Sequence, residues 1–163
     1  QAIQDRNIRT KLNDASYTAF AFDPAFESIG SGKTANYAKI PHSTYYTSEF
    51  NYDSSTGLYS HTHYNSAHVD GETGAQIQTT NVFLLFTKQR IADSYGRREV
   101  TLTGEGEGRY LNGGEYVDII WKRENDDAPF KYYNFDGSEL KVEQGKSYIC
   151  LVDVATQNAV TIS

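Results

Sequence analysis

The chain has 163 residues, the size of one domain, and 38% of them are hydrophobic, so it can bury a core and is not disordered by composition. Its formal net charge of −6, from 15 Lys plus Arg against 21 Asp plus Glu, argues against nonspecific binding of nucleic acids, which depends on clustered cations. The 13 Tyr and 8 Phe, with one Trp and no Met, favour strands over helices.

The N-terminal part of the chain differs from the rest in its pattern. Residues 1–16 carry Ile3, Ile8 and Leu12 at loose helical spacing, which predicts a short amphipathic helix or a linker from a missing upstream domain. Residues 17–163 predict a single β-rich domain that begins with a strand or extended segment.

Strand patterns follow one another through the first half of this domain. Residues 44–52 alternate between two faces, as in a half-buried strand. The loop at residues 53–57 contains Gly57 and predicts a hairpin that returns the chain through residues 58–64. Residues 81–87 are apolar without alternation, which predicts a central strand covered on both faces.

The second half carries the same kind of signal. Asn112-Gly113-Gly114 predicts another hairpin, and Trp121 in the strand after it is predicted to point inward with Val117 and Ile119. The run 148–152 predicts the last strong strand. Turn signals recurring every eight to twelve residues or so predict a mainly β fold, an antiparallel sandwich or partly open barrel with at most one or two short helices.

Two features that resemble reactive sites have simpler structural interpretations. Gly104, Gly106 and Gly108 alternate with glutamates, which would repel a phosphate, so the run predicts a bend or bulge where backbones approach closely. Cys150 is the one cysteine and lies in an apolar strand, so we expect a buried side chain that packs rather than reacts.

The densest polar grouping is near the middle of the chain. The predicted strand at 58–64 places His61 and His63 on one face, and Asp70 follows nearby. These three residues are the candidate ligands if a zinc or non-haem iron ion is bound. The spacing of these residues allows a metal site but does not specify one, and the hairpin is expected to be exposed. The sequence therefore predicts no metal and no other cofactor.

His68 and Asp70 allow two interpretations. They could pair as imidazole and carboxylate for acid–base catalysis. Alternatively, Asp70 organises the turn that Gly71 continues, with His68 packed beside it. We predict the turn, in which Asp70 accepts hydrogen bonds from the backbone N–H groups of residues 71–74. The chain also lacks a Gly-x-Ser-x-Gly motif, so the sequence favours a protein that is not an enzyme.

Tyrosines are too numerous for all of them to be buried. Their rings are apolar and their hydroxyls are polar, which suits contact with a protein or stacking on a sugar. The residues predicted to bind a ligand are His68, Asp70, Tyr59, Tyr64 and Arg97.

An ordered set of short motifs also runs through the chain. The motifs are His68-Val69-Asp70-Gly71-Glu72-Thr73-Gly74, Asn81-Val82-Phe83-Leu84-Leu85-Phe86, Gly96-Arg97, Gly104-Glu105-Gly106-Glu107-Gly108, Ile120-Trp121-Lys122, Asp136-Gly137 and Gly145-Lys146-Ser147-Tyr148-Ile149. Their order and spacing resemble the C-terminal domain of the YerB-like lipoproteins, a bacterial cell-envelope family of uncharacterised function. The resemblance begins near Tyr37.

This resemblance implies an extracytoplasmic protein that a lipid anchors to the membrane. The lipoprotein signal, the anchoring Cys and an N-terminal domain would lie outside this chain, which starts at Gln1 as a trimmed chain would. We therefore expect a noncatalytic binding module whose partner is an envelope protein or polymer. The alternative is an enzyme that uses His68 and Asp70 on a cell-wall or peptide substrate.

Overall fold

The computed structural model describes residues 20–163, so the predicted helix or linker at 1–16 lies outside the described residues. The elements in chain order are β1 (Ala21–Phe22), β2 (Tyr37–Pro41), β3 (Thr47–Asp53), β4 (Leu58–His63), β5 (Ser66–Ala67), β6 (Gln78–Thr79), β7 (Asn81–Thr87), β8 (Gln89–Ile91), β9 (Arg98–Val100), β10 (Gly104–Asn112), β11 (Glu115–Arg123), β12 (Lys131–Asn134), β13 (Lys141–Val142), β14 (Ser147–Asp153), the 3-10 helix η1 (Gln157–Ala159) and β15 (Thr161–Ile162).

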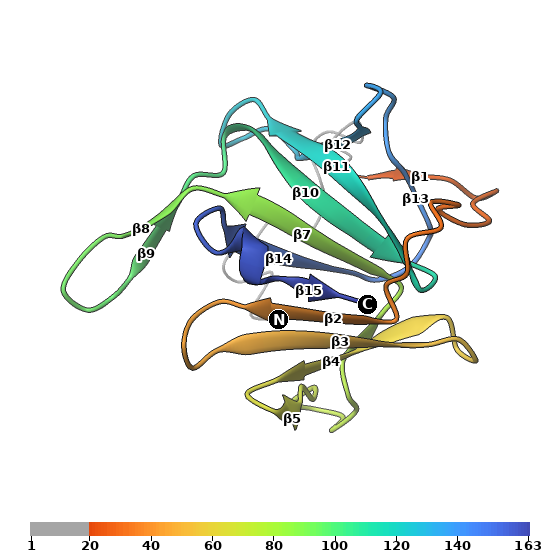
Figure 1. Ribbon diagram of the computed structural model, residues 1–163, viewed down its shortest axis with the longest axis horizontal. Coiled ribbons are helices and arrows are strands. Elements are labelled where there is room, and N and C mark those ends of the chain that lie inside the picture. The colour runs from red at the N-terminus through yellow and green to blue at the C-terminus, as the bar shows by residue number, and fades with distance from the viewer. Residues whose placement is uncertain (1–19) are drawn as a thin grey trace, which may run out of the picture.

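Two sheets lie one above the other (Figure 1). The upper sheet has the strand order β12-β11-β10-β7-β14, and the lower has the order β15-β2-β3-β4-β5, with β6 also paired to β4. The β8–β9 hairpin projects from one end of the upper sheet. The predicted mainly β fold is confirmed, in its sandwich rather than its barrel form. In the described part of the chain, no helix has the length and hydropathy of a membrane span.

Two pairings among the described residues depart from the predicted antiparallel arrangement: the short strands β1 and β13 are parallel, and so are two long strands of the upper sheet. β14 runs parallel to β7, with Tyr148 opposite Val82 and Val152 opposite Phe86. Antiparallel neighbours can be joined by a short turn, whereas parallel neighbours need a long crossover. Here the crossover is the whole segment from β8 to β13. The sequence pattern identifies both strands but carries no signal for their relative direction.

The central strand β7 is buried along its whole length, as its unbroken apolar run predicts. Val82, Leu84 and Phe86 point into the core between the two sheets, where they meet Ile40 of β2 and Phe50 of β3. Because side chains alternate along a strand, the remaining apolar side chains of β7 point to the opposite face of the upper sheet.

A second core covers that opposite face. It joins Phe83 and Leu85 of β7 to Ile119 and Trp121 of β11 and to Tyr132 of β12. Trp121 is 2% exposed, and its indole N–H donates a hydrogen bond to the carbonyl of Phe86 at 3.1 Å. The prediction that Trp121 points inward is confirmed.

The glycine run is explained by this packing. Gly106 lies directly opposite Trp121, and a Cβ at that position would lie 2.7 Å from the indole. A Cβ on Gly108 would lie 2.6 Å from the carbonyl oxygen of Leu84. The predicted close approach is therefore confirmed, but the run is a regular part of β10 and not a bend.

Trp121→Ala should lower the free energy of unfolding by about 3–5 kcal/mol, because it removes a fully buried ring and leaves a cavity. Urea denaturation followed by circular dichroism measures this change. Tyr95→Ala is the control, since Tyr95 is 87% exposed and its loss should change stability by less than about 0.5 kcal/mol. Equal stabilities of the Trp121→Ala and wild-type proteins would contradict the assignment of Trp121 to the core.

Candidate functional site

The candidate site is built on the β4–β5 hairpin, whose register brings three histidines together. Tyr64 and Asn65 form the two-residue turn, with positive φ angles of 49° and 59°, and His63 pairs with Ser66 across it. Further along, the backbone N–H of His68 donates to the carbonyl of His61 at 3.0 Å. His68 is thus the cross-strand neighbour of His61, and their side chains lie on one face of the hairpin.

His61, His63 and His68 form what we call the histidine cluster. The Nδ1 atoms of His61 and His68 are 2.8 Å apart, which is a hydrogen bond in which one ring donates and the other accepts. The ring centroids of His63 and His68 are 4.3 Å apart. One ring nitrogen from each histidine lies within 4.8 Å of the other two.

His61 is the buried member of the cluster. It is fully buried, stacks on Phe50 at 4.7 Å between ring centroids, and lies 4.5 Å from the ring of Tyr148. The expectation that this hairpin is exposed is wrong at His61, because this side chain is on the face of the lower sheet that meets β14.

Burial of His61 has an electrostatic consequence. Burial, with a smaller contribution from the neighbouring histidines, lowers the pKa of His61 to about 4, so its imidazole is neutral at pH 7. Two buried ring nitrogens, Nε2 of His61 and Nδ1 of His63, have no hydrogen-bond partner among the described residues.

Asp70 does not join the cluster. Its carboxylate accepts hydrogen bonds from the backbone N–H groups of Glu72 at 3.1 Å and Thr73 at 2.8 Å, and from the Thr73 hydroxyl at 2.8 Å. These bonds lower its pKa. The predicted turn is confirmed. Among the described residues, no hydrogen bond joins Asp70 to His68, and the third histidine, not Asp70, completes the candidate ligand set.

A groove of about 380 Å³, which we call the tyrosine groove, adjoins the cluster. The rings of Tyr46 and Tyr64 line it, with centroids 4.9 Å apart. The ring of His63 is 6.3 Å from Tyr46 and 5.5 Å from Tyr64, so the groove and the cluster share a boundary.

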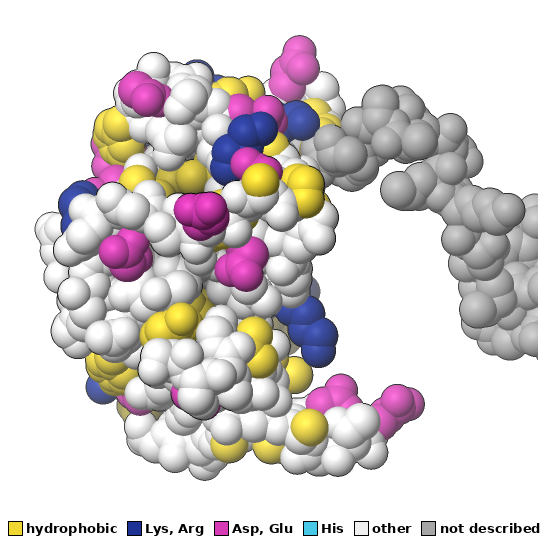
Figure 2. All heavy atoms as spheres, turned by 90° about the vertical axis from the view of Figure 1, so that its right-hand side faces the viewer, with side chains coloured by type: hydrophobic (Ala, Val, Ile, Leu, Met, Phe, Trp, Pro, Cys, Tyr) yellow, Lys and Arg dark blue, Asp and Glu magenta, His cyan; other side chains and the backbone are white. Residues whose placement is uncertain are grey.

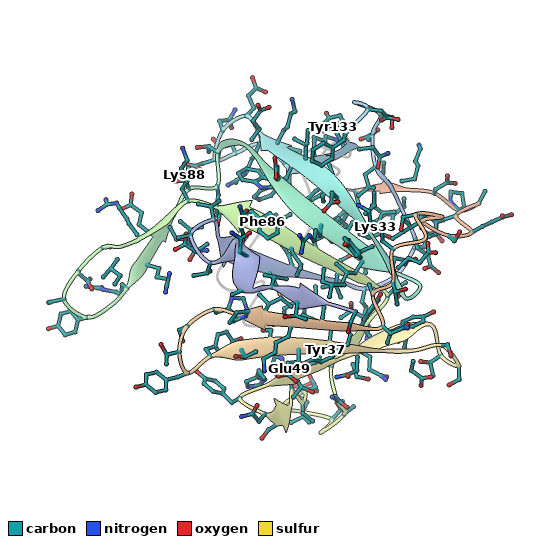
Figure 3. All side chains as sticks on the ribbon, in the orientation of Figure 1. Lys33, Tyr37, Glu49, Phe86, Lys88 and Tyr133 are labelled. Atoms are coloured by element: carbon teal, nitrogen blue, oxygen red, sulfur yellow. The ribbon has the colours of Figure 1, made fainter. Side chains whose placement is uncertain are left out.

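Polar side chains also line the tyrosine groove. A guanidinium nitrogen of Arg98 lies 3.6 Å from the carboxylate of Asp153. The same nitrogen donates a hydrogen bond to the side-chain amide oxygen of Gln89 at 3.4 Å. Arg98 and Gln89 belong to the β8–β9 hairpin, which leaves the body of the molecule just after Lys88 at the end of β7 (Figure 3). The groove therefore offers two rings together with hydrogen-bond donors and acceptors.

Like Asp70, two further residues that were predicted to bind a ligand lie outside the cluster and the groove. Tyr59 is fully buried and its hydroxyl donates to the carbonyl of Ala35 at 3.1 Å, so it belongs to the core. Arg97 pairs with Asp93 and lies over the ring of Tyr95 within the β8–β9 hairpin. Its neighbour Arg98 is the arginine that lines the groove. Successive side chains in a strand point to opposite faces, so Arg97 and Arg98 point different ways. The sequence does not show where β9 starts, and so it could not tell which of the two arginines lines the groove.

Two other hollows, each of about 440 Å³, lie along β10. In the first hollow Arg109 lies 3.3 Å from Asp118, and in the second Glu105 lies 2.9 Å from Lys122. Figure 2 shows a face of the molecule on which acidic, basic and hydrophobic side chains are intermixed and no histidine is visible. We take the histidine cluster and the tyrosine groove as the candidate site, because the cluster contains buried nitrogens without a partner and adjoins the groove.

Comparison with known proteins identifies the relatives of this chain. The family model of the C-terminal domain of a protein of unknown function, DUF3048, matches residues 38–149. A Bacillus subtilis (strain 168) protein named "Putative lipoprotein YerB" is 30% identical over 105 residues, which are 64% of this chain and 30% of that protein. The crystal structure of YerB from Bacillus subtilis superposes with a TM-score of 0.76 at 22% identity. It covers 99% of this chain, which corresponds to 51% of the solved chain.

The low pKa of His61 predicts how stability depends on pH. Its pKa is about 4 when folded and about 6.5 when unfolded. The unfolded chain therefore takes up a proton first, and the stability present above pH 6.5 is progressively lost as the pH falls toward 4, by up to about 3 kcal/mol. Thermal melts of wild type and His61→Phe in a chelating buffer test this. Between pH 7 and 5, the melting temperature of the wild type should fall by more than that of His61→Phe. Identical pH profiles of the two proteins would contradict the lowered pKa of His61.

Proposed function

We propose that this chain, which belongs to the DUF3048 C-terminal domain family, is a noncatalytic binding module of a bacterial cell-envelope lipoprotein and that its tyrosine groove binds an envelope glycan. The chain spans less than a third of the length of the YerB relative and about half of the solved YerB chain. The proposal therefore concerns this domain alone. A relative that is named a lipoprotein supports an extracytoplasmic location with a membrane anchor outside this chain.

The candidate site supports binding over catalysis. The acid–base pair that an enzyme would need from His68 and Asp70 is not assembled, since the Asp70 carboxylate is engaged by its own turn. Cys150 is buried, and burial raises the pKa of its thiol to about 12, so it is not a thiolate nucleophile at neutral pH.

The observation that carries the proposal is the presence of two tyrosine rings and several polar side chains in one groove. Sugar rings have apolar C–H faces that stack on aromatic rings and hydroxyls that need donors and acceptors. Tyr46 and Tyr64 provide the rings. Arg98, Asp153 and Gln89 provide donors and acceptors in the same groove. A volume of about 380 Å³ is in the range of small-ligand sites.

The test is calorimetric titration of the protein with soluble peptidoglycan fragments. Tyr46→Ala should weaken binding by about 5- to 30-fold, because each lost stacking contact removes about 1–2 kcal/mol. Tyr64→Asn should do the same, and Asn tolerates the positive φ of this turn position. Tyr95→Ala is the matched control, because Tyr95 is exposed near the tip of the β8–β9 hairpin and does not line the groove.

Two results would contradict this proposal. Equal affinities of the wild-type, Tyr46→Ala and Tyr64→Asn proteins would place the binding elsewhere. Release of new reducing ends or free peptides from the fragments, lost in His68→Gln, would favour the alternative enzyme instead.

A further inference from the structure

We propose that His61, His63 and His68 form a binding site for one divalent transition-metal ion, with zinc as the first candidate. This inference concerns the histidine cluster and does not depend on what occupies the tyrosine groove. The sequence alone predicts no metal, because it does not reveal that His68 faces His61 across the hairpin.

The backbone holds the three rings in a fixed arrangement. His61 and His63 are two residues apart on β4, so their side chains share a face, and His68 is held opposite His61 by the backbone hydrogen bond between them. The strand carrying His68 is held on its other side as well, since the N–H of Ile77 donates to the His68 carbonyl at 2.7 Å. A site on paired strands loses less conformational entropy on binding an ion than a site on a free loop.

The spacing of the ring nitrogens fits a tetrahedral metal. Zinc binds imidazole nitrogens at about 2.0–2.1 Å, so two ligand atoms of a tetrahedral site lie about 3.3 Å apart. In the cluster, the Nδ1 atoms of His61 and His68 are 2.8 Å apart, and all three ligand atoms lie within 4.8 Å of one another. Side-chain rotations that move atoms by about 1 Å would give the tetrahedral spacing.

An unpartnered buried nitrogen supplies an independent reason. Buried polar atoms are nearly always hydrogen-bonded, because an unsatisfied one costs about 1–3 kcal/mol. Nδ1 of His63 is buried at the cluster without a partner. A coordinated ion would satisfy this atom. It would also replace the proton shared between His61 and His68, and that proton would move to the Nε2 atom of its own ring, which stays a neutral imidazole.

The chemistry of the donors indicates which ion fits. Neutral imidazoles suit Zn²⁺, Cu²⁺, Ni²⁺ and Co²⁺, whereas Mg²⁺ and Ca²⁺ require several oxygen ligands. Only histidines make up the group of ligand atoms identified among residues 20–163. Three histidines also leave one position of a tetrahedral ion for water or another ligand. His63 and His68 are partly exposed, so an ion has a path to the site.

The experiment measures metal binding directly on untagged protein that has been stripped with a chelator and dialysed. Titration with ZnCl2 followed by calorimetry, and elemental analysis after dialysis, should give one zinc per chain with a Kd in the micromolar range or below. Replacing Zn²⁺ by Co²⁺ should give the visible absorption of a tetrahedral nitrogen-bound cobalt ion. MgCl2 and CaCl2 should give no comparable binding.

Variants locate the ion. His63→Gln and His68→Gln should each weaken zinc binding by about 100-fold or more, because each removes one of three ligands. His42→Gln is the matched control. His42 is the fourth histidine of the chain, close to the cluster but bonded to the Ser48 hydroxyl at 3.1 Å, and its loss should change the affinity by less than about twofold.

Three outcomes would overturn the inference, provided that circular dichroism shows the variants to be folded. The first is wild-type protein that does not bind zinc saturably, in which case the three rings only pack on one another. The second is unchanged binding by both His63→Gln and His68→Gln. The third is equal loss of binding in His42→Gln, which would place the ion outside the proposed set.

Discussion

The burial of β7 on both faces is the constraint from which the rest of the molecule follows. Because the side chains on its two faces enter two different cores, this strand packs the upper sheet against the lower sheet on one side and against the segment that contains Leu140 and Val142 on the other. It places its parallel neighbour β14 over the lower sheet, where Tyr148 and Phe50 enclose His61. The neutral, buried state of His61 is therefore a consequence of how the two sheets pack.

Patterns within single strands could be predicted from the sequence. The inward position of Trp121, the double-sided burial of residues 81–87 and the turn role of Asp70 each depend on local periodicity or turn chemistry. The burial of His61 could not be predicted in this way. It depends on β14, which follows about 85 residues later in the chain, and no local pattern indicates which face of the β4 hairpin meets another sheet.

The register of the β4–β5 hairpin is the other feature that the sequence concealed. A two-residue turn with two positive φ angles is usually signalled by Asn-Gly or Gly-Gly, as at Gly113 and Gly114, whereas here the residues are Tyr64 and Asn65. Once this turn is known, His68 must face His61, because Thr62 pairs with Ala67. Because the start of β9 could not be predicted either, the sequence pointed to Arg97 as a binding residue, whereas Arg98 lines the groove.

A metal ion held by the histidine cluster would lie beside the tyrosine groove, since His63 contacts both of its rings. The most direct measurement is therefore a crystal structure of the protein grown with Zn²⁺, with an anomalous difference map at the zinc edge. We expect a single strong peak about 2.0–2.1 Å from one nitrogen of each of His61, His63 and His68. A map without a peak between these rings, or with zinc bound only elsewhere on the chain, would contradict it.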